Sequence, residues 1–275
     1  MGSRGLTAAL AALVVAWLVW AVAANAAMEH AAADGVSATL TYTHNQKNVV
    51  SPYQDLRLTI TRDGHELYDE AVKNAACGNL CYPDRLHVLD VEADGEPDVL
   101  LDLYTGGAHC CFVTEVFRYD DAASHHYTSL LQVWGDPGYK LEQLDGSRPY
   151  EFVSADDRFA YEFTAYAFSG LPLLIERLEN GHFVDVTRSY PALIAPDAAR
   201  WWKDYLENRS GKTGLGFLAA WAADEYNLGK EASVTSTLAG LEKANELRSD
   251  LSVWPSGAKF VTSLERFLLK TGYAG

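Results

Sequence analysis

The spacing of hydrophobic residues changes along the chain, from alternation in its first two thirds to helical spacing in its last third. Between Val36 and Tyr190, apolar and polar side chains alternate over short runs, as at 36–42 and 56–61. This period of two is typical of strands with one buried face. Asp63-Gly64 follows one of these runs and predicts a hairpin turn. Further strands are predicted at 86–89, 99–104, 113–119, 127–133, 151–154, 159–166, 173–178 and 183–186.

Beyond Pro196, apolar side chains recur three and four residues apart, which predicts helices that pack by one face. Asp197 is a predicted N-cap for the first helix, and Gly229 is expected to end the second. We therefore predict a multidomain protein, all-β then all-α. A propeller-like antiparallel β-sheet domain at 35–191 precedes a small helical domain at 196–275. The helices are expected at 197–207, 215–228, 233–247 and 256–269.

The amino-terminal segment predicts export. Arg4 precedes an uncharged apolar run at 6–24, and small residues stand at both signal-peptidase positions of Ala24-Asn25-Ala26. We expect a signal peptide at 1–26. The alternative is an uncleaved anchor, because the run is long enough to cross a bilayer. Both alternatives predict a secreted or extracytoplasmic protein.

The charge balance excludes some partners. The chain has 22 Lys and Arg against 37 Asp and Glu, a formal net charge of −15, and no basic stripe. Nucleic-acid binding is therefore not expected. Anionic lipid would repel such a surface, so no membrane contact is expected beyond the N-terminal segment. The oligomeric state has no signal in the sequence.

Four cysteines, an even number in an exported chain, predict two disulfides. Three pairings are possible. We favour the two that join Cys77 and Cys81 to Cys110 and Cys111, because a bridge between adjacent residues is strained. A zinc site that includes His109 is the alternative, but the ligand spacing does not suit it.

The segment 90–98 places oxygen donors at alternate positions and a glycine, Gly95, at the sixth. A hard cation with six to eight oxygen ligands favours this arrangement, so we predict a structural calcium site. The alternative is a tight, solvated turn between two strands. The expected ligands are Asp90, Glu92, Asp94, the carbonyl of Glu96, and Asp98.

This loop and the strand after it resemble the D-x-D-x-D-G-x-x-D element of FG-GAP and VCBS-type repeats, which binds calcium in β-propeller blades. The resemblance implies the same five ligands, although that family usually has Asp or Asn in place of Glu92 and Gly in place of Ala93. A weaker copy at 144–153 carries Arg148 and is interpreted as a structural turn. The two copies lie one blade-sized unit apart. The β region could hold roughly three such units, which is fewer than a closed propeller needs.

More broadly, the segments 94–98, 105–111 and 156–161 resemble an uncharacterised family of secreted bacterial proteins. That resemblance implies export and the β-then-α order, and it implies no activity. Gly211-Lys212-Thr213 lacks the upstream glycine of a phosphate-binding loop, and no G-x-S-x-G motif occurs. We therefore assign no catalytic residue.

Two functions remain. We favour a secreted, non-enzymatic binding or interaction module, rigidified by calcium and disulfides, whose partner is a glycan or a cell-envelope protein. Its expected contacts are Tyr104, His109 and Trp134, although His109 can also be a loop imidazole that the disulfides hold. The alternative is an extracytoplasmic hydrolase of cell-wall or polysaccharide material. It would use a carboxylate pair, with Glu162 or Asp157 as candidates, in a cleft between the domains.

Overall fold

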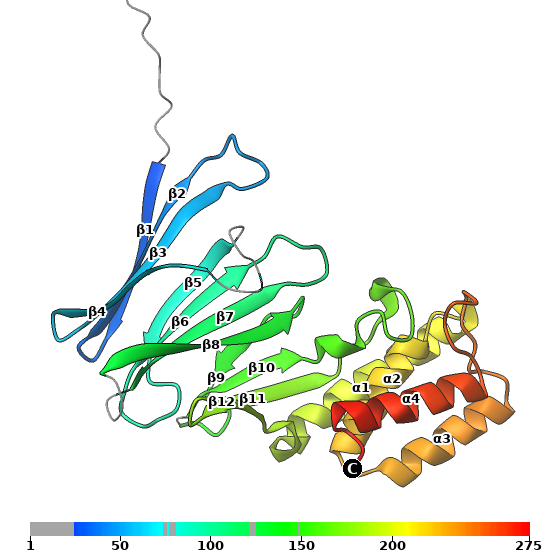
Figure 1. The fold of residues 1–275 in the computed structure, drawn as a ribbon. Helices are drawn as coiled ribbons and strands as arrows, with labels where there is room; N and C mark the ends of the chain where they lie inside the picture. Colours follow the sequence, from blue (N-terminus) through cyan, green and yellow to red (C-terminus); the bar gives the residue numbers. More distant parts are fainter. Residues whose placement is uncertain (1–24, 74–75, 77–80, 121–124, 148) are drawn as a thin grey trace, which may run out of the picture.

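A computed structural model describes residues 25–73, 76, 81–120, 125–147 and 149–275. Its strands form three four-stranded antiparallel sheets, and the helices follow them in the chain (Figure 1). The β-then-α order predicted from the hydrophobic spacing is therefore confirmed. Most of the predicted signal segment lies outside the described residues, and its last two positions, Asn25 and Ala26, lie in the first strand.

Each sheet is built from consecutive strands. The first has the order β1-β2-β3-β4, the second β5-β6-β7-β8, and the third β12-β11-β10-β9. The strands are β1 Asn25–Ala33, β2 Val36–His44, β3 Tyr53–Arg62, β4 His65–Ala71, β5 Tyr82–Leu89, β6 Asp98–Tyr104, β7 Phe112–Asp120, β8 His126–Gly135, β9 Lys140–Glu142, β10 Glu151–Ala155, β11 Leu173–Glu179 and β12 His182–Asp185.

The second sheet is central and is covered on both faces. Leu101 and Leu103 of β6 pack in one core with Leu40 of β2 and Leu58 of β3, two strands of the first sheet. Leu100, on the other face of β6, belongs to a separate core shared with the third sheet. Every residue of β6 except its last is buried, which explains why its leucines occupy both faces of the strand instead of alternating with exposed polar residues.

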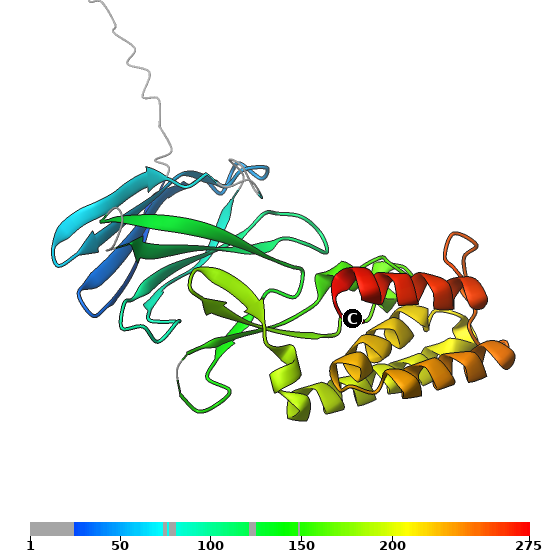
Figure 2. The same ribbon diagram turned by 60° about the horizontal axis from the view of Figure 1, so that its bottom comes forward.

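The helices pack around a third core. They are α1 Pro191–Asn208, α2 Leu215–Asn227, α3 Glu231–Lys243 and α4 Ala258–Thr271. Figure 2 shows the third sheet between the second sheet and the helices. Among the described residues, no helix combines the length and the apolar character needed to cross a bilayer.

The described strands form three separate sheets, with neither a closed barrel nor a closed propeller. Two expectations need correction. The predicted strand at 159–166 is absent: 3-10 turns at Asp157–Phe159 and Tyr166–Phe168 flank this segment, and its apolar residues Phe159 and Phe163 pack on the helical core. The first helix begins at Pro191 rather than Asp197, because Pro is tolerated in a first helical turn.

Candidate functional site: a cleft at one end of the central sheet

Residues of chemical interest lie at both ends of the second sheet. The register pairs Tyr82 with Tyr104, Tyr104 with Phe112, and Phe112 with Gly135. The segment 105–111 and the residues after Gly135 therefore share one end, which we call the cleft end. The segment 90–98 joins β5 to β6 at the opposite end, which we call the acidic-loop end.

Three aromatic side chains meet at the cleft end. The ring centroids of His109 and Tyr166 are 4.0 Å apart, and those of Tyr161 and Tyr166 are 5.4 Å apart. Tyr161 is 48% exposed, which is unusual for a large side chain with two ring neighbours. We call His109, Tyr161 and Tyr166 the aromatic triad.

The backbone that carries the triad is held in left-handed conformations. His109 and Tyr161 have φ values of 61° and 62°, and Cys111 has 118°. Such values in side-chain-bearing residues persist only where the surrounding structure fixes them, and they concentrate at functional sites. The amide of Thr105 donates to the carbonyl of Cys111 at 3.0 Å, and the Tyr104 hydroxyl donates to the carbonyl of Gly107.

Two carboxylates lie directly behind the triad. The Tyr166 hydroxyl donates to Asp136, and the amide of Asp136 donates to Asp157 at 3.4 Å. Gly135 allows this approach, because a Cβ there would overlap the Asp157 carboxylate. Burial raises the pKa of Asp157, and the nearby Asp136 carboxylate raises it further, while the Asp136 amide opposes the shift.

Asp157 also lines a pocket of about 540 Å³ between the second sheet, the third sheet and the end of α4. Glu176 on β11 faces this pocket, pairs in register with Asp185 on β12, and accepts a hydrogen bond from Gln132 at 2.6 Å. Burial, and next the charge of Asp185, raise the pKa of Glu176 to about 7. The pocket wall also includes Trp134, Gly135, Ser154, Asp156, Arg158, Leu174, Phe183 and Thr271.

The pocket is fixed to the helices by a buried carboxylate. Asp156 is 2% exposed and accepts hydrogen bonds from Arg158 at 2.6 Å and from the Tyr273 hydroxyl at 2.9 Å. Arg158 also donates to the carbonyl of Thr271, the last residue of α4, at 3.2 Å. The wall formed by 156–158 is therefore hydrogen-bonded to the end of α4 and follows directly on β10 of the third sheet.

The three expected ligand contacts have different environments. His109 is exposed and belongs to the triad. Tyr104 packs between Tyr82 and Phe112 and supports the loop from behind. Trp134 is only 3% exposed and donates to the Thr114 hydroxyl at 2.8 Å, so it is a core residue at the base of the pocket rather than an exposed contact.

The two carboxylates named as candidates for a hydrolase differ in their position relative to the pocket. Asp157 lines the pocket, as that hypothesis requires. Glu162 is exposed and does not line it. Two acidic residues line the pocket from the third sheet, Glu176 on β11 and Asp185 on β12, and the sequence singled out neither.

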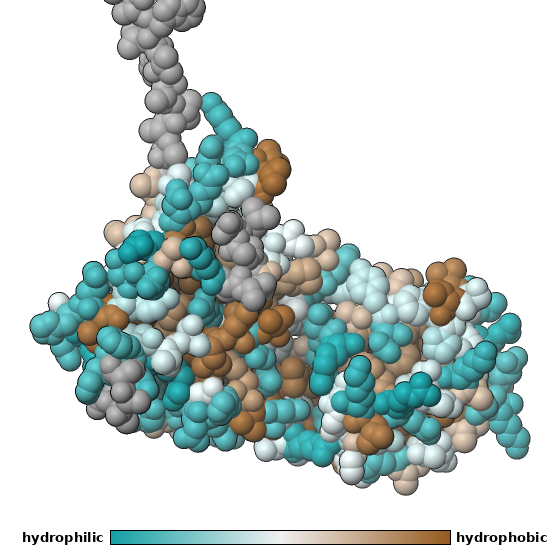
Figure 3. Space-filling model, viewed as in Figure 1, coloured by the Kyte–Doolittle hydropathy of each residue, from teal (hydrophilic) through white to brown (hydrophobic). Residues whose placement is uncertain are grey.

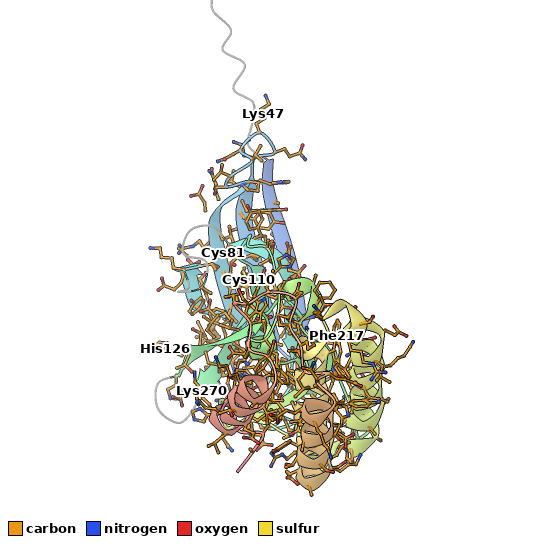
Figure 4. All side chains as sticks on the ribbon, turned by 90° about the vertical axis from the view of Figure 1, so that its right-hand side faces the viewer. Lys47, Cys81, Cys110, His126, Phe217 and Lys270 are labelled. Atoms are coloured by element: carbon orange, nitrogen blue, oxygen red, sulfur yellow. A yellow bond between two sulfur atoms is a disulfide. The ribbon has the colours of Figure 1, made fainter. Side chains whose placement is uncertain are left out.

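The disulfide pairing that we favoured is wrong. Cys110 and Cys111 are joined to each other, so neither can bridge to Cys81. Glycine makes this possible: a Cβ at Gly107 would collide with both sulfur atoms, so the loop folds tightly around the bridge. Cys81 is also disulfide-bonded, and Cys77 lies outside the described residues. Figure 4 labels Cys81 and Cys110 in the same region of the molecule.

The segment 90–98 forms a compact, internally bonded loop. Asp90 and Asp98 are 6% and 4% exposed. Asp90 accepts from the amides of Asp94 at 3.2 Å and Gly95 at 3.1 Å, while Asp98 accepts from the amide of Val91 at 3.3 Å. Burial, and next the charge of Glu92, raise the pKa of Asp98 to about 8.

Arginines from neighbouring strands neutralise two of the loop acids. Arg118 on β7 donates to Glu92 at 2.5 Å and lies 3.8 Å from Asp98, and Arg62 on β3 pairs with Glu96. The donor types suit calcium, but Glu92 is directed to Arg118, so the set fits an ion only in part. Within the described parts of the chain, no group of three or more His, Cys, Asp or Glu has a metal-holding arrangement.

No family model and no solved structure matches the chain. An uncharacterised protein of Sinorhizobium fredii is 29% identical over 196 residues, which are 69% of this chain and 30% of that protein. A probable thylakoid lumen protein of Synechocystis is 34% identical over 151 residues, 53% of this chain and 44% of that protein. The chain thus spans less than half the length of these curated relatives.

Proposed function

We propose that this protein is an extracytoplasmic, non-enzymatic module that binds a saccharide at the aromatic triad. The observation that carries the proposal is the exposed Tyr161 ring, held by a left-handed backbone beside Tyr166 and His109. A flat exposed ring offers an apolar face for the C–H face of a sugar, and its position is fixed before the ligand arrives.

The groups around the triad favour a neutral sugar. Asp136 and Asp157 are hydrogen-bond acceptors for sugar hydroxyls, and the pocket beyond them has room for a further ring. An anionic ligand would meet these carboxylates and a chain of net charge −15. A neutral glycan of the cell envelope is the partner that this chemistry suits.

Two observations support the extracytoplasmic location. The Cys110–Cys111 bridge and the bonded Cys81 are typical of an oxidising compartment. The Synechocystis relative carries the name of a probable thylakoid lumen protein, and a lumen is also outside the cytoplasm.

Titration of the protein with soluble hexose and N-acetylhexosamine oligosaccharides tests the proposal. We expect binding by calorimetry, no change in the sugar, and about tenfold weaker affinity for Tyr161→Ala, since one stacked ring contributes about 1.4 kcal/mol. Tyr161→Phe keeps the ring and should bind normally. Val184→Ala removes an exposed apolar side chain elsewhere and is the control. Equal affinity for all three variants would contradict a site at the triad.

Hydrolysis is the second candidate function, and Glu176 favours it. A carboxyl with a pKa of about 7 retains its proton near neutral pH and can protonate a leaving oxygen. If the protein is a hydrolase, incubation with cell-wall polysaccharide releases reducing ends. Glu176→Gln then abolishes this release without abolishing binding of the polysaccharide. Binding without turnover by the unsubstituted protein selects the first proposal.

Calcium at 90–98 is a further part of the proposal. It is supported by five oxygen donors on one loop and by positive φ values at Ala93 and Gly95, where the loop folds back on itself. We expect a chelator to lower the melting temperature and Asp94→Ala to abolish that difference. An unchanged melting temperature with chelator would reject a tightly coupled site.

We also propose a propeller-like relation between the three sheets. Each sheet is a four-stranded antiparallel meander, as a propeller blade is. A solution structure of a longer relative, with further sheets around a central axis, would support this relation.

A further inference from the structure

The loop between β2 and β3, residues 45–52, has features of a membrane-contacting surface. Val49 is 86% exposed and Val50 is 75% exposed, the two highest values of any large hydrophobic side chain in the described chain. Single exposed apolar residues are common, but two adjacent ones at the tip of a hairpin are not explained by packing. Figure 3 shows a hydrophobic patch at this end of the first sheet.

This tip lies where the apolar N-terminal run meets the fold. The uncharged run at 6–24 ends directly before β1, whose first residue, Asn25, pairs with His44, the last residue of β2. The loop 45–52 begins at the next residue. The chain therefore enters the first sheet at the same end from which the loop projects, and the helices lie on the far side of the molecule (Figures 1 and 4).

The charge of this region differs from that of the whole chain. Residues 43–54 contain one charged side chain, Lys47, and no Asp or Glu, in a protein with 37 acidic residues. A surface without acids avoids the repulsion that anionic lipid exerts on the rest of the protein. Lys47 can contact lipid phosphate while the valines enter the apolar interface.

The loop is supported from behind, so its tip is presented outward. The amide of Asn45 donates to the carbonyl of Pro52 at 2.7 Å, and the Tyr82 hydroxyl donates to the carbonyl of Val50 at 3.3 Å. His44 stacks on Tyr53 at 4.6 Å between ring centroids. Tyrosine is also a preferred side chain at the level of lipid headgroups.

We propose that the tip Lys47–Val50 docks on a bilayer, and the proposal rests on the alternative in which the segment 6–24 is an uncleaved anchor. The N-terminal run and the tip then form two neighbouring attachment points, which orient the first sheet toward the membrane and the helices away from it. This extends the membrane contact beyond the N-terminal segment to which the sequence alone confined it.

The test uses the full chain in vesicles of phosphatidylcholine with a minority of phosphatidylglycerol. Val49→Cys is labelled with an environment-sensitive fluorophore, and Val253→Cys, at a site 73% exposed before α4, is the matched control. We expect a nitroxide on the lipid headgroup to quench the label at position 49 at least about twofold more than the label at position 253. Each docked valine buries only part of its side chain in the bilayer, so we expect partial quenching at position 49.

A second variant checks that the valines carry the contact. A label at Lys47→Cys should be quenched in the otherwise unsubstituted chain and much less in the Val49→Asn, Val50→Asn background. Equal quenching at positions 49 and 253 would overturn the proposal. So would a spectral shift at position 49 that needs no lipid and grows with protein concentration, because it would identify a second copy of the chain as the occupant.

Discussion

At the acidic-loop end of the second sheet, guanidinium groups lie against the carboxylates, whereas at the cleft end Asp136 accepts from a tyrosine and Glu176 from a glutamine. Arg118 and Arg62 neutralise Glu92 and Glu96 at the first. In the described chain, no basic side chain lies within ion-pair distance of Asp157 or Glu176 at the second. Both ends bury acids, but among the described acidic residues that line the pocket only Asp156 has an arginine partner, Arg158.

The difference separates a structural role from a binding role. Carboxylates with internal partners contribute to holding three strands together, and a ligand would have to displace those partners. Carboxylates without an internal cationic partner can still accept hydrogen bonds from a ligand. Their pKa values are raised, and perturbed pKa values are typical of functional sites. This contrast is why we place the proposed saccharide site at the cleft end.

Removal of Arg118 should have the largest effect. Arg118→Ala leaves Glu92, whose side chain is 7% exposed, without its counter-charge. We expect a loss of about 3 kcal/mol in the free energy of unfolding, because breaking one side of a buried pair leaves a desolvated charge. Urea denaturation monitored by circular dichroism measures it.

Arg57→Ala is the control, since Arg57 pairs with Asp69 at the surface and should matter far less. Calcium sharpens the comparison further. If the loop binds Ca²⁺, millimolar Ca²⁺ should restore more stability to Arg118→Ala than it adds to the unsubstituted protein. A loss no larger than that of Arg57→Ala would show that the acidic-loop end does not depend on internal neutralisation.

The sequence predicted the second sheet better than the cleft beside it. Strands such as β6 have short-range signals, because alternation or continuous apolarity reports which faces are covered. The acidic loop could be located for the same reason, since its donors lie within nine consecutive positions.

The triad could not be found in this way. It joins Tyr161 and Tyr166 to His109 across more than fifty positions, and the segment 159–166 alternates like a strand although it folds as turns. The local signal that was available is Asp156, whose side chain accepts from the amide of Arg158 and starts the first turn. Tertiary packing of Phe159 and Phe163 on the helices overrides the strand pattern.

Titration of Glu176 should have the next largest effect. Its pKa is about 7 in the fold against an ordinary 4.5, so the folded state holds a proton that the unfolded chain loses. The free energy of unfolding should therefore fall as the pH rises from about 4.5 to 7, by at most about 3 kcal/mol from this residue. Glu176→Gln cannot ionise and should flatten that part of the profile.

Denaturation of the two proteins at pH 5 and pH 8 measures the difference. Asp224→Asn is the control: Asp224 is fully buried in α2, and burial and then the Asp197 charge raise its pKa to about 9. Its removal should also change the profile above pH 7, where Glu176→Gln should not. Parallel profiles for Glu176→Gln and the unsubstituted protein would show that the cleft carboxyl is solvated and would weaken the contrast between the two ends.

The smallest effect on stability is expected from the Cys110–Cys111 bridge. A bridge between adjacent residues closes almost no chain, so it constrains the unfolded state very little, unlike bridges across long loops. We expect the double substitution Cys110→Ser, Cys111→Ser to change the free energy of unfolding by under about 1 kcal/mol.

The backbone of 105–111 should relax, however, and move His109 away from Tyr166, so saccharide affinity should fall severalfold while stability hardly changes. Calorimetric titration alongside denaturation separates the two quantities, and a large loss of stability with intact binding would mean that the bridge supports the fold rather than the triad.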